Sequence, residues 1–211
     1  MTRMAEGILG AVLAGGESRR FGASKTLSEV GGLPMASWAI KALKDAGLFV
    51  GVISSEDDLE GVLGVPVRPD LEPGKGPVGG LLTALAWAKE RKHTGVFLLG
   101  CDMPLVSVGV VSELLSKMDA SAAVIPIGLH GAEPLCGFYS LSCFQAVRRV
   151  LDSRDNSMHR LLELIQVKEV QLVDTDGVMG PGEAFFNVNT REEALEVDAI
   201  LTDQRSKKIE G

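Results

Sequence analysis

The stretch GILGAVLAGGESRRFGASK, from Gly7 to Lys25, combines two patterns that together predict the fold. Residues 8–14 are apolar on both faces and end at a Gly-Gly step, which is typical of a buried parallel strand. The residues that follow carry hydroxyl, guanidinium and ammonium groups. Open α/β sheets bind ligands beyond the carboxyl ends of their strands, so a ligand is expected at this loop.

Apolar strands and amphipathic helices continue to alternate along the chain. In PMASWAIKALKDAG the apolar residues share one helical stripe, with Pro34 in the first turn and Gly47 at the cap. This alternation predicts an α/β fold with a doubly wound, mostly parallel sheet, Rossmann-like, in three α/β/α layers. Strands are expected at 8–14, 48–54, 64–68, 95–100, 122–127, 133–140 and 167–173 and in AFFNVNT (184–190), and helices at 34–47, 78–91, 107–118, 142–152 and 157–165 and after Thr190, which forms a T-x-x-E capping box with Glu193.

Composition limits the class of protein. The chain has 211 residues, 45% of them hydrophobic, which predicts a single domain over 1–211. A net charge of −7 means that an anionic ligand must meet local positive groups, and nucleic-acid binding is not expected. Three cysteines without a C-x-x-C pair, no membrane-length apolar run and no signal-peptide pattern predict a cytoplasmic protein without membrane contact.

The opening loop fits neither of two common phosphate motifs. Gly16 and Gly22 are separated by five residues, rather than the four of a Walker A loop. The second motif, the dinucleotide-binding pattern G-x-G-x-x-G, is absent from the loop. It appears instead at 74–79, where it follows a weak strand and has Pro77 at a position where a backbone N–H donor would be useful. The loop still offers close backbone approach and several cations, so it predicts an anion site, and a solvated turn is the alternative.

Four stretches resemble the motifs of a known family. LAGGESRRFGASK is similar to the signature L-A-G-G-x-S-x-R-x-G-x-x-K of nucleotidyltransferases of the molybdenum cofactor type, within the nucleoside-triphosphate transferase superfamily. RPDLEPGKGPVGGLLTAL, LLGCDMP and FFNVNTREE resemble that family's later motifs in the same order. The four stretches extend over nearly the whole chain. One departure is Ser24, which precedes the loop lysine where Asp is common.

The resemblance implies a reaction. Such enzymes transfer GMP from GTP to molybdenum-molybdopterin with Mg²⁺ and release pyrophosphate. Gly15-Gly16 favours the guanine branch, because the sister enzymes that use CTP typically show L-A-A-G. The alternative is CTP or another phosphorylated acceptor, such as a sugar phosphate, a polyol phosphate or phospholactate. The resemblance also implies transient contacts with proteins that supply and accept the cofactor.

The resemblance further implies roles for individual residues. Arg19, Lys25 and Asp102 are expected to be catalytic: Arg19 stabilises the departing pyrophosphate and Lys25 neutralises the phosphates. Asp102 follows a buried strand and is the expected Mg²⁺ ligand, since one carboxylate with phosphates around it suffices. Capping of the next helix is its alternative role, although Ser107 lies nearer the helix start. The expected nucleotide-binding residues are Leu13, Ala14, Gly15, Gly16, Lys25, Ser54, Asp70, Gly76, Pro77, Gly79 and Asp102.

The C-terminal part is expected to serve the acceptor. Asn187 and Asn189 are expected to bind the acceptor or complete the metal shell, and a strand-end turn is the alternative. Residues 1–127 then form the nucleotide-binding part and 128–200 the acceptor-binding part. The charged residues 203–211 are expected to be a frayed tail.

Overall fold

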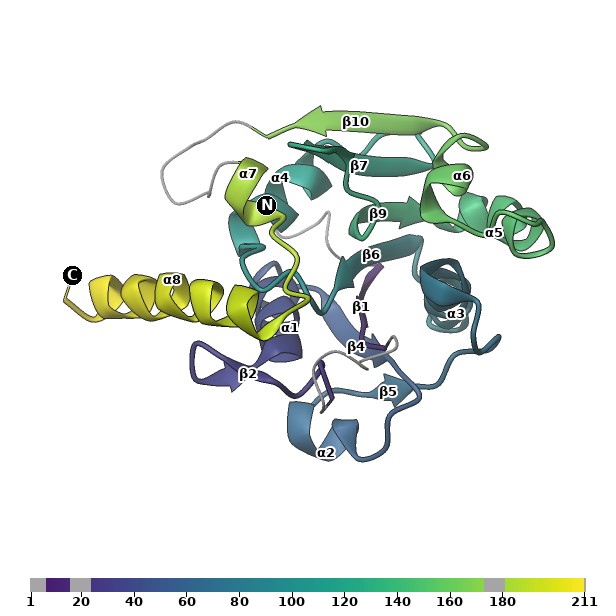
Figure 1. Cartoon of the computed structure of the whole chain (residues 1–211). Coiled ribbons are helices and arrows are strands. Elements are labelled where there is room, and N and C mark those ends of the chain that lie inside the picture. Colours follow the sequence, from purple (N-terminus) through teal and green to yellow (C-terminus); the bar gives the residue numbers. More distant parts are fainter. Residues whose placement is uncertain (1–6, 16–23, 173–180, 211) are drawn as a thin grey trace.

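One mixed sheet forms the middle layer of the protein (Figure 1). The computed structural model describes residues 7–15, 24–172 and 181–210. Within these residues the sheet has eight strands, namely β1 (Ile8–Leu13), β4 (Phe49–Ile53), β5 (Val67–Arg68), β6 (Gly95–Gly100), β7 (Ala123–Gly128), β8 (Gly131–Ala132), β9 (Cys136–Ser140) and β10 (Val167–Gln171). Their order is β10-β7-β9-β6-β1-β4-β5, and β8 pairs with β7. The predicted, mostly parallel α/β sheet is confirmed, with β9 antiparallel to both β6 and β7.

The three central strands end at the same edge of the sheet. β1 lies between β4 and β6, and its last residue, Leu13, is paired with Ile53 and with Gly100. The ladder continues by one residue, because the backbone N–H of Ala14 donates to Ile53 O at 3.0 Å and that of Cys101 donates to Leu13 O at 3.0 Å. Three carboxyl ends therefore lie side by side, as they do where open α/β sheets bind ligands.

Helices cover both faces of the sheet and complete the three layers (Figure 1). One layer consists of α1 (Met35–Asp45) and α4 (Val108–Ser116), and the other of α3 (Gly76–Glu90), α5 (Phe144–Leu151) and α6 (Met158–Leu162). The central strand shows why both faces are covered. In β1, Ile8 and Val12 belong to one buried apolar cluster and Leu9 and Ala11 to the other, because successive side chains of a strand point to opposite faces.

The C-terminal helix α8 (Arg191–Glu210) packs against the hairpin of β2 (Glu29–Val30) and β3 (Leu33–Pro34). Asp198 Oδ1 accepts a hydrogen bond of 2.6 Å from the backbone N–H of Gly31. A third buried cluster joins these parts to the end of the sheet and consists of Val30, Met35, Leu105, Val188, Val197 and Leu201. None of the helices that the structure describes is long and apolar enough to cross a membrane.

One expectation for the C-terminal segment is wrong, and the fraying of residues 203–211 stays a prediction. AFFNVNT is not a strand: the helix α7 (Pro181–Ala184) includes its first residue, and 185–189 have no regular structure. Backbone groups there form turn bonds, such as Phe186 N–H to Glu183 O at 3.1 Å, rather than a ladder. The tail expected to fray lies largely in α8, which continues to Glu210. A capped and anchored helix extends easily, since each added residue contributes one hydrogen bond.

Smaller differences concern lengths. The expected strand at 64–68 is only two residues long, and the strand at 133–140 begins at Cys136. Several short elements were not predicted, namely β2, β3, the helix α2 (Leu59–Leu63) after β4, β8 and α7. The helix expected at 142–152 begins instead as the 3-10 turn η2 (Leu141–Cys143) before α5. Segments of so few residues carry too little periodicity to be recognised in a sequence.

Candidate active site

A cavity of about 830 Å³ opens at the carboxyl ends of β1, β4 and β6. Its size is within the range of small-molecule sites. Most of the residues predicted to bind nucleotide or to act in catalysis line it, namely Leu13, Ala14, Gly15, Lys25, Ser54, Asp70, Gly76, Pro77 and Asp102. Residues from four separate stretches of sequence therefore meet in one place, as expected for the carboxyl edge of a parallel sheet.

The other three residues predicted to bind nucleotide or to act in catalysis are Gly16, Arg19 and Gly79. Gly16 and Arg19 lie outside the described residues. Gly79 is buried in the first turns of α3, where a Cβ would lie 2.9 Å from Lys75 Cβ and 3.1 Å from Glu72 O. It therefore packs against the approach to the helix rather than facing the cavity.

The next glycine, Gly80, lines the cavity and lets α3 approach β1 closely. A Cβ there would lie 2.7 Å from Leu13 Cδ2, which is much shorter than an ordinary contact. The helix entry that precedes it contains Gly76 with a φ of +60°, a conformation that glycine adopts without strain. Backbone shape at this wall therefore depends on glycine at two places.

Lys25 joins two distant segments at the cavity. Its Nζ lies 3.0 Å from Asp102 Oδ2 and donates to Asn189 Oδ1 at 2.9 Å. The side chains of Lys25 and Asp102 are about four-fifths buried, with exposed fractions of 20% and 21%. The loop lysine, the strand-end aspartate and one of the two asparagines thus form a single cluster, although 164 residues separate Lys25 from Asn189 in the sequence.

Several hydrogen bonds hold Asn189 in this cluster. Val188 N–H donates to Asp102 O at 2.9 Å, which fixes the segment against the end of β6. Glu193 Oε2 accepts from the backbone N–H of Asn189 at 2.6 Å and of Thr190 at 2.8 Å, and Thr190 Oγ1 accepts from Glu193 N–H at 3.2 Å. The predicted capping box is therefore confirmed, and it also places the asparagine.

Asn187 has a different environment from Asn189. Its Nδ2 donates to Phe185 O at 3.3 Å, within its own turn. Its backbone oxygen accepts from Asn189 Nδ2 at 3.3 Å, which orients that amide. Only Asn189 of the pair contacts Lys25 among the interactions that the structure describes, so Asn187 supports the turn.

The donor set at Asp102 fits a hard divalent cation. Two oxygens, Asp102 Oδ2 and Asn189 Oδ1, converge on one cationic atom, the Nζ of Lys25. Mg²⁺ takes oxygen ligands and is commonly held by one or two carboxylates together with phosphates and water. No group of three or more His, Cys, Asp or Glu side chains that could hold a metal occurs in the described part of the chain. Substrate oxygens would therefore have to complete the shell.

The wall of the cavity is acidic where it is described. Glu56, Asp70 and Asp102 line it together with one cation, Lys25, among residues 7–15, 24–172 and 181–210. Three carboxylates facing a polyphosphate would repel it. A bound divalent cation would offset that repulsion. The acidic wall is therefore consistent with the metal site that the oxygens of Asp102 and Asn189 suggest.

Burial changes the acidity of two groups near the cavity. Desolvation raises the pKa of Asp70, and a hydrogen bond from Thr83 Oγ1 at 3.4 Å partly offsets this effect. Burial, with the neighbouring charge of Asp102 as a second cause, raises the pKa of the Cys101 thiol to about 12. Cys101 is thus an inert buried thiol, whereas Asp70 is a carboxylate short of solvent that a ligand with N–H or O–H donors would satisfy.

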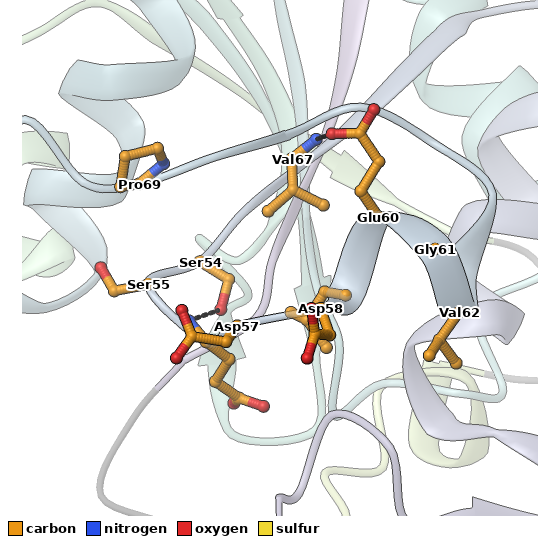
Figure 2. A pocket seen from close by; sticks show the side chains of 11 residues that line it. Ser54, Ser55, Asp57, Asp58, Glu60, Gly61, Val62, Val67 and Pro69 are labelled. Carbon is orange, nitrogen blue, oxygen red and sulfur yellow. Dashed lines mark hydrogen bonds between the residues drawn. The ribbon is translucent and has the colours of Figure 1, made fainter.

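The turn after β4 separates this cavity from a second hollow of about 660 Å³ (Figure 2). Ser54, Ser55 and Glu56 line both spaces, and the rest of the hollow combines acidic residues such as Asp57 and Glu60 with apolar ones such as Val62. Ser54 is buried, and its Oγ accepts from the backbone N–H of Glu56 at 3.1 Å. Its predicted place at the nucleotide site is thus combined with a role in shaping the turn.

Sequence reasoning did not single out Thr26, Glu56 or Thr83. Thr26 and Glu56 line the cavity and are hydrogen-bonded to each other at 2.9 Å, while Thr83 reaches Asp70 from α3. No motif marks these residues. The position of Glu56 just after the end of an apolar strand was the one signal that could have flagged it.

Comparison with known proteins agrees with this geometry. Residues 10–172 match the family described as the MobA-like NTP transferase domain. The chain belongs to this family. The resemblance inferred from its four motifs is therefore confirmed, and the match includes the loop lysine and Asp102 but ends before Asn189.

Relatives of the MobA-like chain carry one recurring name. A probable molybdenum cofactor guanylyltransferase from Pelotomaculum thermopropionicum is 29% identical over 201 residues, which covers 95% of this chain and 96% of the relative. Another from Bacillus cytotoxicus is 30% identical over 196 residues and covers 90% and 96%.

Solved structures share the fold. The molybdopterin-guanine dinucleotide biosynthesis protein A of Archaeoglobus fulgidus matches with a TM-score of 0.73 at 22% identity, covering 92% of this chain and 99% of that one. A Mycobacterium tuberculosis protein solved as a manganese complex matches with a TM-score of 0.65 at 18% identity, covering 91% and 98%. Both solved structures thus share the fold of this chain.

Proposed function

We propose that this protein transfers GMP from GTP to the terminal phosphate of molybdenum-molybdopterin, which forms the guanine dinucleotide cofactor and releases pyrophosphate. The observation that carries this proposal is that Asp102 Oδ2 and Asn189 Oδ1 converge on the Nζ of Lys25, where Lys25 and Asp102 line the cavity. The guanylyltransferase names of relatives that match over most of their length support the same reaction.

The chemistry needs charge rather than a base. An oxygen of the acceptor phosphate attacks the α-phosphorus, a new P–O bond forms there, and the bond to the β-phosphate breaks as pyrophosphate leaves. A phosphate monoester with a second pKa near 6 is already largely ionised at pH 7. The obstacle is repulsion, since two like charges about 4 Å apart cost roughly 4 kcal/mol at an effective dielectric of 20.

Positive charge at the cavity is proposed to offset that repulsion. In this proposal Asp102 and Asn189 hold Mg²⁺, which supplies positive charge to the phosphates when bound. Lys25 turns from these two oxygens toward the triphosphate and neutralises it. Gly15 presents backbone to the nucleotide at the end of β1. Arg19 completes the positive charge near the departing pyrophosphate.

Asp70 is proposed to favour guanine. It lines the cavity beside Gly76 and Pro77, and its carboxylate accepts hydrogen bonds only. Guanine presents two adjacent N–H donors, at N1 and at the 2-amino group, whereas cytosine presents one donor beside an acceptor. A half-buried carboxylate therefore pairs better with guanine.

The remaining assignments concern the acceptor and the cell. Residues 1–127 are proposed to hold the nucleotide and residues 128–200 the acceptor, and Asn189 of the second part contacts Lys25 of the first. A cytoplasmic site of action, with transient contacts to proteins that supply and take up the cofactor, follows from the proposed reaction.

A substrate screen tests the proposal. Pyrophosphate release is measured with GTP and CTP side by side, each with molybdenum-molybdopterin, a sugar phosphate or a polyol phosphate as acceptor and with Mg²⁺. The proposal expects turnover with GTP and the pterin. Stronger activity with CTP would reject the guanine assignment, and activity with a sugar phosphate alone would reject the pterin.

Variants test the residues. Asp102→Asn keeps the shape but removes the charge, and about 100-fold lower turnover is expected, as for the loss of one preorganised electrostatic group. Asp152→Asn, an exposed aspartate at the end of α5, is the matched control. Equal turnover in Asp102→Asn and wild type would remove Asp102 from the metal site.

A further inference from the structure

Glu56 reaches across the cavity to the loop that carries Lys25. One carboxylate oxygen, Oε1, accepts a hydrogen bond of 2.9 Å from Thr26 Oγ1, and the other, Oε2, accepts one from Ser24 Oγ. The two donors are the residues immediately before and after Lys25. A single side chain from the turn after β4 therefore holds both neighbours of the lysine, 30 and 32 residues away in the sequence.

Both ends of this contact are themselves fixed. On one side, Ser54 Oγ accepts from Glu56 N–H at 3.1 Å, which orients the turn. On the other side, Thr26 is buried with 1% exposure, and its backbone oxygen accepts from Ala36 N–H at 3.2 Å. Glu56 thus links the end of β4 to a buried residue, Thr26, that is itself hydrogen-bonded to the first turn of α1.

The lysine loop is also bonded internally around Ser24. Ser24 Oγ accepts from Leu27 N–H at 3.3 Å, and Ser24 O accepts from Ser28 Oγ at 3.0 Å. Ser28 N–H donates to Lys25 O at 3.3 Å. Residues 24–28 therefore form one compact turn, and Glu56, a side chain from another part of the chain, accepts from two of its three hydroxyls, those of Ser24 and Thr26.

The consequence falls on Lys25. Its long, flexible side chain loses rotamer entropy when the ammonium is held in one place. Fixing the residues on either side sets the direction of the Cα–Cβ bond of Lys25. The Nζ therefore reaches Asp102 and Asn189 with a smaller loss of conformational entropy. Small errors in such a direction are amplified along a four-carbon stem.

We propose that Glu56 is a positioning residue that aims Lys25 into the cavity through Ser24 and Thr26. The phosphate-binding role of Lys25 rests on the proposed function. The orientation of its side chain in the protein without nucleotide does not. Glu56 contributes here as an acceptor of two hydroxyl hydrogen bonds, and its negative charge is secondary. Replacing it by Gln should therefore matter less than replacing it by Ala.

The first test needs no nucleotide. Trace acetylation with acetic anhydride, followed by peptide mass spectrometry, gives the labelling rate of Lys25 relative to exposed Lys44 on α1. Glu56→Ala should raise that ratio about threefold or more, because two hydrogen bonds that order the loop are lost. Asp57→Asn, an exposed neighbour, removes the same charge and should leave the ratio unchanged. An unchanged ratio in Glu56→Ala would overturn the proposal.

The second test measures coupling. Glu56→Ala should weaken Mg·GTP binding about 10- to 30-fold, as the loss of two ordinary hydrogen bonds would. In a Lys25→Ala background the same change should have almost no further effect, whereas a general loss of structure would weaken binding equally in both backgrounds. Additive losses would therefore refute positioning. Wild-type protein that binds no GTP would reject the proposed function and leave the labelling result as the test of Glu56.

Two further variants distinguish the proposed positioning role of Glu56 from a general loss of folding. Ser24→Ala removes one of the two bonds at a half-buried position and should give a smaller rise in Lys25 labelling than Glu56→Ala. Glu56→Gln keeps an acceptor for Thr26 and can donate to Ser24 Oγ, so GTP affinity should stay within about threefold of wild type. If Gln and Ala at position 56 were equally damaging, charge rather than hydrogen bonding would be responsible, contrary to the proposal.

Discussion

A methyl group at Gly100 tests the geometry of Asp102 without removing it. Gly100 is the last residue of β6. A Cβ built there would lie 2.6 Å from Asp102 Oδ1 and 3.7 Å from Leu135 Cβ. Ordinary contacts begin near 3.4 Å, so the difference from 2.6 Å requires the carboxylate oxygen to move by about 0.8 Å. The contact with Leu135 is ordinary, so the rest of the site tolerates the methyl group.

The displacement should impair activity much more than stability. Mg²⁺ demands near-ideal octahedral geometry, and a misplacement of about 1 Å costs about 100-fold in rate. Gly100→Ala should therefore lower kcat/KM by about 30- to 100-fold, or about 2 to 3 kcal/mol of transition-state stabilisation. A loss of no more than about 1 kcal/mol in unfolding free energy corresponds to a Tm shift of about 2–4 °C for a chain of this size.

Pyrophosphate release over a range of Mg²⁺ concentrations is the assay, with thermal unfolding measured on the same samples. Gly61→Ala is the matched control, because a Cβ at Gly61 meets no atom within 4 Å. The variant should need more Mg²⁺ for half-maximal activity, and the control should not. Wild-type kcat/KM and Mg²⁺ dependence in Gly100→Ala would show that the orientation of Asp102 does not matter, which would refute the metal site drawn here.

Two other substitutions separate stability from function. Burial raises the pKa of Asp70, so the ionised carboxylate lowers the free energy of unfolding. This destabilisation is absent below the unfolded pKa of 3.8, grows as the pH rises from there and is complete above the folded pKa. Asp70→Asn should therefore raise the Tm at about pH 8, not at about pH 3, while weakening GTP binding; an equal Tm at pH 8 would contradict this. Glu193→Ala removes the acceptor of two backbone N–H groups and should cost about 1 kcal/mol, seen as a lower Tm, together with a loss of activity through Asn189. Glu192→Ala, an exposed neighbour in the same turn, is the control, and equal effects of the two would remove the capping box from the site.

Much of the site was predictable because parallel strands bring their carboxyl ends together. Once residues 8–14 and 95–100 are recognised as strands, the loop before Lys25 and Asp102 must lie at one edge of the sheet. The structure places Gly15, Lys25 and Asp102 at the cavity on this edge, beside the paired residues Leu13 and Gly100. The prediction needed only periodicity, turn glycines and the rule of ligand binding at that edge.

Contacts between side chains from separate segments of the chain were not predicted. The contact of Glu56 with Ser24 and Thr26 joins residues about 30 positions apart, and neither the turn after β4 nor the loop carries a pattern that names its partner. The AFFNVNT segment failed for a related reason. Its apolar and asparagine residues alternate as in a strand, but its backbone bonds to nearby turns and to Asp102 O, and no strand of the described residues pairs with it.

The sequence alone determined the α/β alternation, the edge of the sheet where ligands bind and the chemical types gathered there, because these depend on short-range patterns and on the geometry common to all parallel sheets. Tertiary structure decided which asparagine reaches Lys25, where α8 docks, and which carboxylate holds the residues beside the lysine. Those outcomes depend on the distances between side chains from separate segments. Such distances exist only after the two cores and the α8 cluster have packed.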